Sequence, residues 1–224
     1  MIAPASLPSA SRPWIKVCGI RAAADLEACA SAGATHVGIN TWPGSPRSAS
    51  PQAAATLLQL ARRLGLASVL LHLPGSLLPL AAALHLRPDF VQVLRPPTPS
   101  LRHALASAGI GLVESRPVQP SSAPGLPWGQ VLLLDSSCPS APGGTGKVSD
   151  WSVASRAPRP FVLAGGLGPD NVAAGIAACR PVGVDAASRL ESRAGRKDPA
   201  MIRDYCAAAR DAFRKAFEET PHVL

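Results

Sequence analysis

Residues 14–39 read WIKVCGIRAAADLEACASAGATHVGI and contain the unit whose repetition decides the fold. The apolar run 14–18 predicts a β-strand, and the run 35–39 predicts a second one. The alanine-rich stretch 22–32 between them is typical of a helix, which Gly33 ends. Consecutive strands joined through a helix lie parallel in one sheet, so this stretch predicts an α/β protein.

The same alternation continues to the end of the chain. Further strands are predicted at 67–72, 89–94, 110–113, 130–135, 160–164 and 182–185. Helices are predicted at about 51–64, 76–85, 98–108 and 149–155, from Asp170 and Asn171 onward, and at 199–217. Eight strand–helix units in 224 residues predict a single (β/α)8 TIM barrel of slightly less than typical size.

The barrel is expected to occupy residues 14–218, between a flexible N-terminal tail (1–13) and a C-terminal tail (219–224). The segment 115–129 is rich in Pro, Ser and Gly, so the fifth helix is predicted to be stunted or replaced by a loop. A doubly wound open sheet is the competing architecture. The turn at 18–21 (CGIR) lacks the GxGxxG pattern of that fold, which favours the barrel.

Composition restricts the classes of function. Hydrophobic residues make up 47% of the chain and charged residues 16%, which suits a packed core and disfavours disorder. The net charge is +8, but the basic residues are scattered and aromatic residues amount to 4%, so no nucleic-acid partner is expected. Five cysteines without a CxxC pair and five histidines without metal spacing predict neither a disulfide framework nor a bound metal.

One uncharged stretch, 64–86, is long enough to suggest a membrane helix. Pro74 and Gly75 divide it and Pro79 follows, so it is predicted to be strand, turn and helix. No targeting segment is recognised, and we expect a soluble, cytoplasmic protein without a membrane partner. No surplus apolar stripe distinguishes a monomer from a homodimer, and both stay open.

Chemistry in such a barrel lies where strands end and loops begin, and Cys18 ends the first strand. Lys16 precedes it by two positions, so both side chains are predicted to point into the barrel. A nearby cation would lower the thiol pKa and make Cys18 a competent base or nucleophile. Taken alone, an inert buried cysteine is the commoner alternative.

Three other polar residues stand at strand ends or in the following loops. Asp135 ends the run 130–135 and either takes part in proton transfer or caps the loop after it. Arg47 either grips a carboxylate or is a solvated loop residue. Asp185 either binds a substrate hydroxyl or anchors its loop.

Two glycine clusters follow late strands, at 143–147 (GGTGK) and 164–167 (AGGL). The second stands between a strand and a helix, where backbone N–H groups can face phosphate oxygens. The first does not fit a P-loop, because the glycine spacing before Lys147 is wrong and no helix follows at once. In barrels, phosphate commonly lies beside the last two strands.

These pieces occur together in one order along residues 14–215. They are Lys16–Ile20 (KVCGI), Ser45–Arg47 (SPR), Leu134–Ser137 (LDSS), Gly143–Lys147 (GGTGK) with Asp150 and Trp151, Leu163–Leu167 (LAGGL) with Pro169–Val172 (PDNV), and Gly183–Asp185 (GVD) with Lys197 and Asp198. In this combination the chain resembles the phosphoribosylanthranilate isomerase family of tryptophan biosynthesis.

The resemblance implies a (β/α)8 barrel that performs an Amadori rearrangement of a phosphoribosyl substrate without metal or organic cofactor. It implies that Asp135 is the general acid that opens the furanose ring. Cys18 would be the general base that removes the C2 proton, and Arg47 would hold the anthranilate carboxylate. The remaining substrate-binding residues implied in this way are Gly144, Gly165, Gly166, Asp185, Ser188 and Arg189.

The chain departs from the family pattern at three places. Leu94 stands where the family has a histidine, Gly38–Thr41 (GINT) replaces an aromatic-rich motif, and Ala187–Arg189 (ASR) replaces Ser-Ser-Gly. Loss of that glycine removes freedom for positive φ, for which the charge of Arg189 is expected to compensate. These departures leave an alternative: a divergent barrel that binds a phosphosugar or another anion with weak or altered activity.

Overall fold

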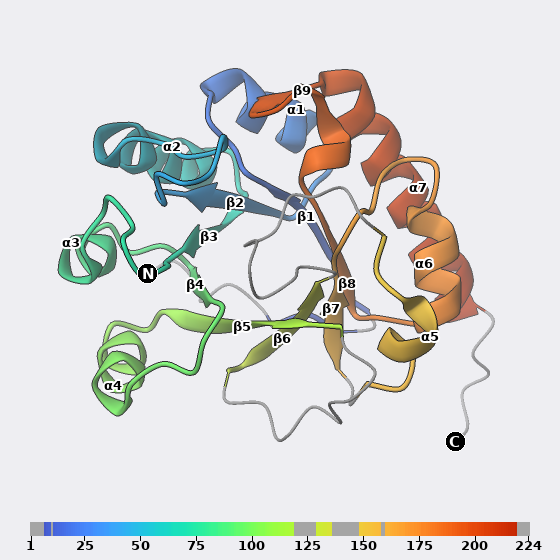
Figure 1. Ribbon diagram of the computed structural model, residues 1–224. Coiled ribbons are helices and arrows are strands. Elements are labelled where there is room, and N and C mark those ends of the chain that lie inside the picture. Colours follow the sequence, from blue (N-terminus) through green and yellow to red (C-terminus); the bar gives the residue numbers. More distant parts are fainter. Residues whose placement is uncertain (1–6, 10, 119–128, 136–147, 158–159, 219–224) are drawn as a thin grey trace.

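The computed structural model describes residues 7–9, 11–118, 129–135, 148–157 and 160–218. Its eight main strands are parallel and pair in chain order, and β8 pairs back with β1 (Figure 1). They are β1 (Trp14–Cys18), β2 (His36–Asn40), β3 (Ala67–Leu71), β4 (Phe90–Val93), β5 (Gly111–Pro117), β6 (Val131–Asp135), β7 (Phe161–Leu163) and β8 (Gly183–Ala186). The closed ring confirms the predicted (β/α)8 barrel and excludes the open sheet.

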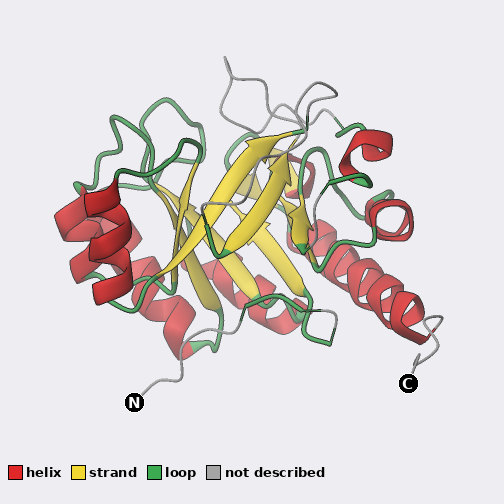
Figure 2. Ribbon diagram, turned by 90° about the horizontal axis from the view of Figure 1, so that it is seen from below, coloured by secondary structure: helices red, strands yellow, loops and turns green. Residues whose placement is uncertain are grey.

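The helices lie outside the strands, as the perpendicular view in Figure 2 shows. They are α1 (Ala23–Ala32), α2 (Pro51–Arg63), α3 (Leu80–His85), α4 (Pro99–Ser107), α5 (Trp151–Ala154), α6 (Val172–Cys179) and α7 (Pro199–Glu218). The predicted stunting of the helix between β5 and β6 falls on 119–128, outside the described residues. None of the described helices combines the length and apolarity that a membrane crossing requires.

Two elements differ from their predicted bounds by more than two residues. α3 begins at Leu80 rather than at residue 76, because the backbone first turns at Leu73–Ser76 and Pro79 then takes the position just before the helix. β5 continues to Pro117 instead of ending at residue 113. Its polar continuation is paired with β6 along its length, and the fully buried Glu114 forms an ion pair with Arg116.

A short hairpin in the loop after β8 was not predicted. A single 3₁₀ turn, η1 (Ser188–Leu190), leads into β9 (Glu191–Arg193), which pairs antiparallel with β10 (Arg196–Lys197). The stretch 189–197 is dense in basic residues, and its sequence pattern predicts no strand. Strands of three and two residues are too short to show an alternating pattern.

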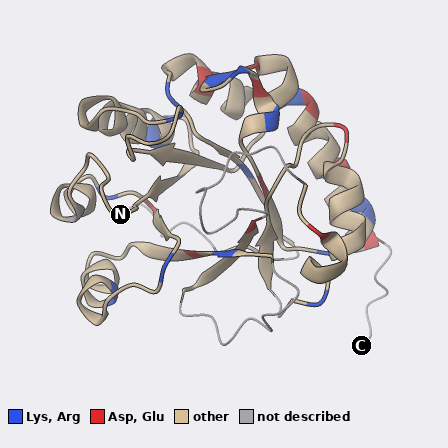
Figure 3. Cartoon of the chain, in the orientation of Figure 1, with Lys and Arg blue, Asp and Glu red and all other residues tan. Residues whose placement is uncertain are grey.

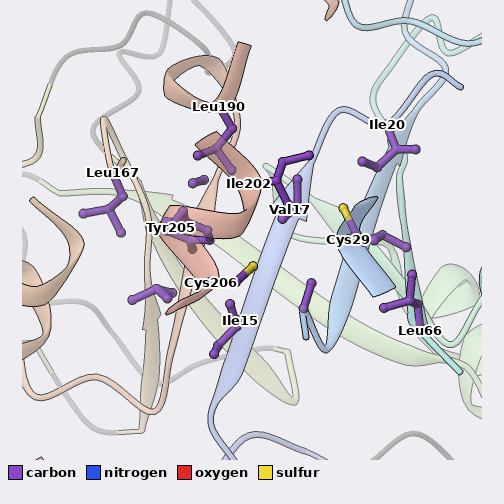
Figure 4. Packing of buried hydrophobic residues seen from close by; sticks show 14 of the residues in the cluster. Ile15, Val17, Ile20, Cys29, Leu66, Leu167, Leu190, Ile202, Tyr205 and Cys206 are labelled. Atoms are coloured by element: carbon purple, nitrogen blue, oxygen red, sulfur yellow. The ribbon is translucent and has the colours of Figure 1, made fainter. Parts of the chain in front are cut away.

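Alternate side chains of β1 point to opposite sides of the sheet, as the period-two rule requires. Ile15 and Val17 belong to the layer between strands and helices, together with Tyr205 and Cys206 of α7 (Figure 4). Trp14 belongs instead to the cluster that fills the barrel, whose other members are Val69, Phe90, Val113, Val131, Leu133, Val162 and Ala164. The odd and even positions of β1 therefore serve two separate cores.

An aromatic stack surrounds His36 in this inner layer. Its ring lies parallel to Trp14 with a centroid separation of 3.8 Å, and Phe90 lies edge-on to Trp14. Nδ1 is 2.8 Å from the Thr35 hydroxyl, whereas Nε2 is buried without a hydrogen bond to any described residue. Burial, with a smaller effect of the Lys16 charge, lowers the pKa of His36 to about 3.

Acid is therefore expected to destabilise the fold partly through His36. In the unfolded chain the pKa of histidine is about 6.5. Between that value and 3 the unfolded state binds one more proton, so stability falls as the pH falls through this window. Urea unfolding measures the free energy of unfolding at pH 6.5 and at pH 4.5. Its decrease between the two pH values should be smaller for His36→Leu than for the wild type, by about 2 kcal/mol. Equal decreases in the two proteins would show that His36 is not the group responsible.

Candidate active site

The carboxyl ends of the eight strands meet at one mouth because all strands run in the same direction. Cys18 is the last residue of β1, Asp135 is the last of β6, and Asp185 lies in β8 opposite Lys16 of β1. Burial raises the pKa of Asp185 against the lowering effect of Lys16, and the Asp135 charge adds to the rise, so the two carboxyl groups interact electrostatically. The structure thus brings the predicted acid and base strands to one mouth.

Lys16 links three strands across the barrel interior. Its Nζ donates to Asp185 Oδ2 at 2.9 Å and to Gln92 Oε1 of β4 at 3.3 Å, and its side chain is fully buried. Burial alone would lower the pKa of Lys16, but Asp185 and Cys18 together outweigh it and the pKa is raised. The predicted inward cation is therefore present and stays charged.

Cys18 lies beside this pair and is 8% exposed. Burial raises the pKa of the thiol, and the lowering effect of Lys16 does not offset it. The predicted net lowering of this pKa is wrong, because burial outweighs the lowering effect of Lys16 and the Asp185 charge adds to the rise. The thiol is held in its protonated form in the free protein.

Gly38 of β2 provides the space in which the thiol lies. A Cβ atom built at Gly38 would stand 3.1 Å from Cys18 Cα and 2.6 Å from Cys18 Sγ, and the second distance is too short for a Cβ unless the thiol moves. Gly38 makes direct room for the candidate base, and the departures from the family pattern lie in the three residues after it. Strand β2 therefore fixes the position of Cys18 from the side.

Asp185 carries one unused acceptor. Oδ2 accepts from Lys16, while Oδ1 is buried and makes no hydrogen bond with the residues described. A buried carboxylate oxygen costs free energy when it has no partner. Of the two roles predicted for Asp185, contact with a substrate hydroxyl accounts for this atom, whereas anchoring a loop leaves it unpaired.

Arg47 is bonded within the protein, a pairing that the sequence did not predict. Its Nε donates to Glu191 Oε1 at 2.7 Å and its Nη2 donates to Glu191 Oε2 at 2.8 Å. This is the two-bond geometry predicted for a carboxylate, but the carboxylate belongs to β9. The guanidinium is not a solvated loop group, since its side chain is 11% exposed.

Glu191 is held by further donors. Lys197 Nζ donates to Oε1 at 2.9 Å and the Gly195 N–H donates to Oε2 at 3.1 Å. Burial by itself would raise the pKa of Glu191, but Arg47, Lys197 and Gly195 together lower it. Figure 3 shows charged segments of both signs side by side at β9. An isolated acid in a basic stretch was the signal that could have identified Glu191.

The loops after β7 and β8 also meet. Gly165 and Gly166 have φ of +90° and +64°, a conformation that glycine adopts freely. Arg189 of η1 donates from Nη1 to the Gly166 carbonyl at 3.2 Å and from Nη2 to Asp170 at 2.6 Å. Ser188 begins the same turn. The predicted phosphate-binding residues Gly165, Gly166 and Arg189 are thus brought together.

Two predictions stay as predictions here. Gly144 lies outside the described residues, so its part in the site is untested. Within the described ranges no group of three His, Cys, Asp or Glu side chains is placed to hold a metal ion.

Comparison with known proteins agrees with this geometry. A family model described as N-(5'phosphoribosyl)anthranilate (PRA) isomerase matches residues 15–208. The N-(5'-phosphoribosyl)anthranilate isomerase of Leptothrix cholodnii is 34% identical over 225 residues, covering 94% of this chain and 96% of the relative. That of Paracoccus denitrificans is 37% identical over 209 residues, covering 87% and 96%.

A solved structure, TrpF from Jonesia denitrificans, superposes with a TM-score of 0.71 at 30% identity, covering 89% of this chain and 98% of the other. The sequence match spans the barrel, and the structural match reproduces it. The chain therefore belongs to the N-(5'-phosphoribosyl)anthranilate isomerase family.

Proposed function

We propose that this chain carries out its family's reaction with Cys18 as general base and Asp135 as general acid. The reaction is the isomerisation of N-(5'-phosphoribosyl)anthranilate in tryptophan biosynthesis. The observation that supports these roles is the thiol of Cys18 beside the buried Lys16–Asp185 pair, at the mouth where Asp135 also ends its strand. We also propose that the protein carries out this reaction in the cytoplasm.

The acid acts first. Asp135 gives its proton to the furanose ring oxygen, the C1–O bond breaks, and the lone pair of the anthranilate nitrogen forms a C1=N bond. After ring opening the Cys18 thiol passes its proton to solvent, and the resulting thiolate takes the proton from C2, whose bonding electrons form the enolamine. The C2 hydroxyl then gives its proton to the Asp135 carboxylate while C1 gains the proton held by Cys18, which gives the ketone.

The environment of Cys18 suits a base that is needed only after ring opening. The raised pKa keeps the Cys18 thiol protonated before the substrate reacts. The thiolate that forms later needs a nearby positive charge to stabilise it. Lys16 is the fixed cation, and the opened substrate brings a second one at its iminium nitrogen. The same nitrogen accepts the electrons released from C2, so the steps use no cofactor.

Substrate contacts follow from the rest of the mouth. Arg47 faces the anthranilate carboxylate, and the free Asp185 Oδ1 accepts from a sugar hydroxyl. The phosphate lies at the loops after β7 and β8, on Gly165, Gly166, Ser188 and Arg189, with Gly144 from the loop after β6.

The activity is tested directly with purified protein and freshly prepared N-(5'-phosphoribosyl)anthranilate. Loss of the substrate's anthranilate-type fluorescence, together with rescue of an isomerase-deficient tryptophan auxotroph, is the expected result. No substrate consumption, with phosphate binding retained in calorimetry, would instead support the divergent anion-binding barrel.

Arg189→Met is expected to weaken phosphate binding without altering the chemical step. The side chain is 32% exposed and shares its charge with Asp170, so the inhibition constant of inorganic phosphate should rise only about three- to tenfold. Turnover at saturating substrate should stay within about twofold of the wild type. Arg203→Gln on α7 removes an exposed arginine elsewhere and is the matched control. An unchanged inhibition constant in Arg189→Met would remove Arg189 from the phosphate site.

A further inference from the structure

Glu191 cannot act as a temporary stand-in for a substrate carboxylate. Four donors hold its two oxygens, from Arg47, Lys197 and the Gly195 backbone, and its side chain is 3% exposed. Displacing it would leave the buried Lys197 ammonium with the Ala187 carbonyl as its one acceptor among the described residues. Breaking such a buried arrangement is costly, so Glu191 stays bonded when substrate enters.

Arg47 keeps one edge of its guanidinium for another partner. The Nε and Nη2 atoms are engaged with Glu191, whereas Nη1 donates to no described residue. A guanidinium carries five N–H donors in a planar fork, so two edges can each hold a carboxylate. With the Nε–Nη2 edge fixed, the Nη1–Nη2 edge is left for an incoming anion.

Backbone contacts fix the position of Arg47 further. A Cβ atom at Gly19, the residue after Cys18, would lie 2.6 Å from Arg47 Cδ, so the side chain crosses directly over the end of β1. A Cβ atom at Gly195, in the turn of the β9–β10 hairpin, would collide with the Pro46 carbonyl oxygen. The hairpin that presents Glu191 therefore packs against the loop that carries Arg47.

From these contacts we infer that Glu191 is a positioning residue for the reaction. It holds one edge of Arg47 so that the other edge meets the substrate's aromatic carboxylate beside Cys18. The inference rests on the proposed role of Arg47 and adds the β9–β10 hairpin to the machinery of substrate selection. Glu191 itself does not touch the substrate.

The test compares two substrates that differ only in the carboxylate: N-(5'-phosphoribosyl)anthranilate and N-(5'-phosphoribosyl)aniline. The measured quantity is the preference, the ratio of their kcat/KM values. The proteins are the full chain, Glu191→Gln, Arg47→Met, the double variant, and Arg193→Gln, which removes a charge from the exposed side of the same hairpin. The aniline compound reports whether the barrel and the phosphate site remain intact.

The wild type is expected to prefer the carboxylated substrate by at least about tenfold. Glu191→Gln should lower that preference about tenfold while kcat/KM for the aniline compound stays within about twofold. Arg47→Met should bring the preference close to one, the double variant should match Arg47→Met because both act through one contact, and Arg193→Gln should keep the wild-type preference.

Other outcomes overturn the inference in distinguishable ways. If Glu191→Gln keeps the preference of the wild type, or loses kcat/KM equally for both substrates, Glu191 has no positioning role and Arg47 still binds the carboxylate. If the wild-type protein itself shows no preference, Arg47 does not bind the substrate carboxylate. If Glu191→Gln does not fold, Glu191→Asp decides: a preference between those of the wild type and Arg47→Met supports positioning, and an unchanged preference overturns it.

Discussion

Cys18→Ala is expected to lower kcat by about 10²- to 10⁴-fold, the range that a general base contributes. Alanine cannot accept the C2 proton, and the opened substrate would then have no base on that face. Substrate affinity should change little, because Arg47 and the phosphate loops do not depend on the thiol. Steady-state kinetics by anthranilate fluorescence, with phosphate inhibition measured in parallel, separates the two effects.

Cys29→Ala is the matched control, since Cys29 is a fully buried thiol of α1 in the layer outside the barrel. It should keep near-wild-type kcat, with a cost in stability only. Near-wild-type turnover in Cys18→Ala, with correct folding by circular dichroism, would assign the proton transfer to another group.

Asp135→Asn is expected to reduce kcat by a similar factor of about 10² to 10⁴. The amide has the shape of the carboxylic acid but cannot release a proton to the ring oxygen, so the furanose stays closed. Binding of a reduced product analogue, in which the ring is already open, should be within a few-fold of the wild type. That contrast distinguishes loss of the acid from damage to the site.

Asp211→Asn on α7 changes an exposed aspartate far from the strand ends in sequence and serves as the control for Asp135→Asn. It is expected to leave kcat and analogue binding unchanged. The acid role of Asp135 would be refuted by full activity in Asp135→Asn, or by loss of analogue binding in proportion to kcat.

The barrel itself could be predicted because its strands are apolar runs and its helices are bounded by strong signals. Ser50 accepts a hydrogen bond from Ala53 with Pro51 at the first position of α2, the arrangement those residue types favour. β5 was predicted too short because Glu114 and Arg116 look like loop residues until their ion pair is seen. Hydrophobic periodicity does not detect a strand whose polar residues satisfy one another.

The site could be predicted only residue by residue. Strand ends and motifs identified Cys18, Asp135 and Asp185, because position along a parallel strand is local information. The direction in which the pKa of Cys18 shifts cannot be predicted from the neighbouring sequence. It depends on how deeply the thiol is buried and on the group with which Lys16 already pairs. The Arg47–Glu191 bond joins residues 144 positions apart, and spacing alone does not reveal such a contact.

The ion pair between Lys16 and Asp185 joins the first and last strands of the ring. On the ribosome, β1 with Lys16 and Cys18 emerges before β8, and Asp185, the charge partner of Lys16, emerges about 170 residues after it. Until then Lys16 lacks its counter-ion and one edge of β1 lacks its neighbour. Nascent fragments that end before β8 therefore contain the Cys18 thiol without the Lys16–Asp185 ion pair beside it, and the site is completed only after β8 has been synthesised.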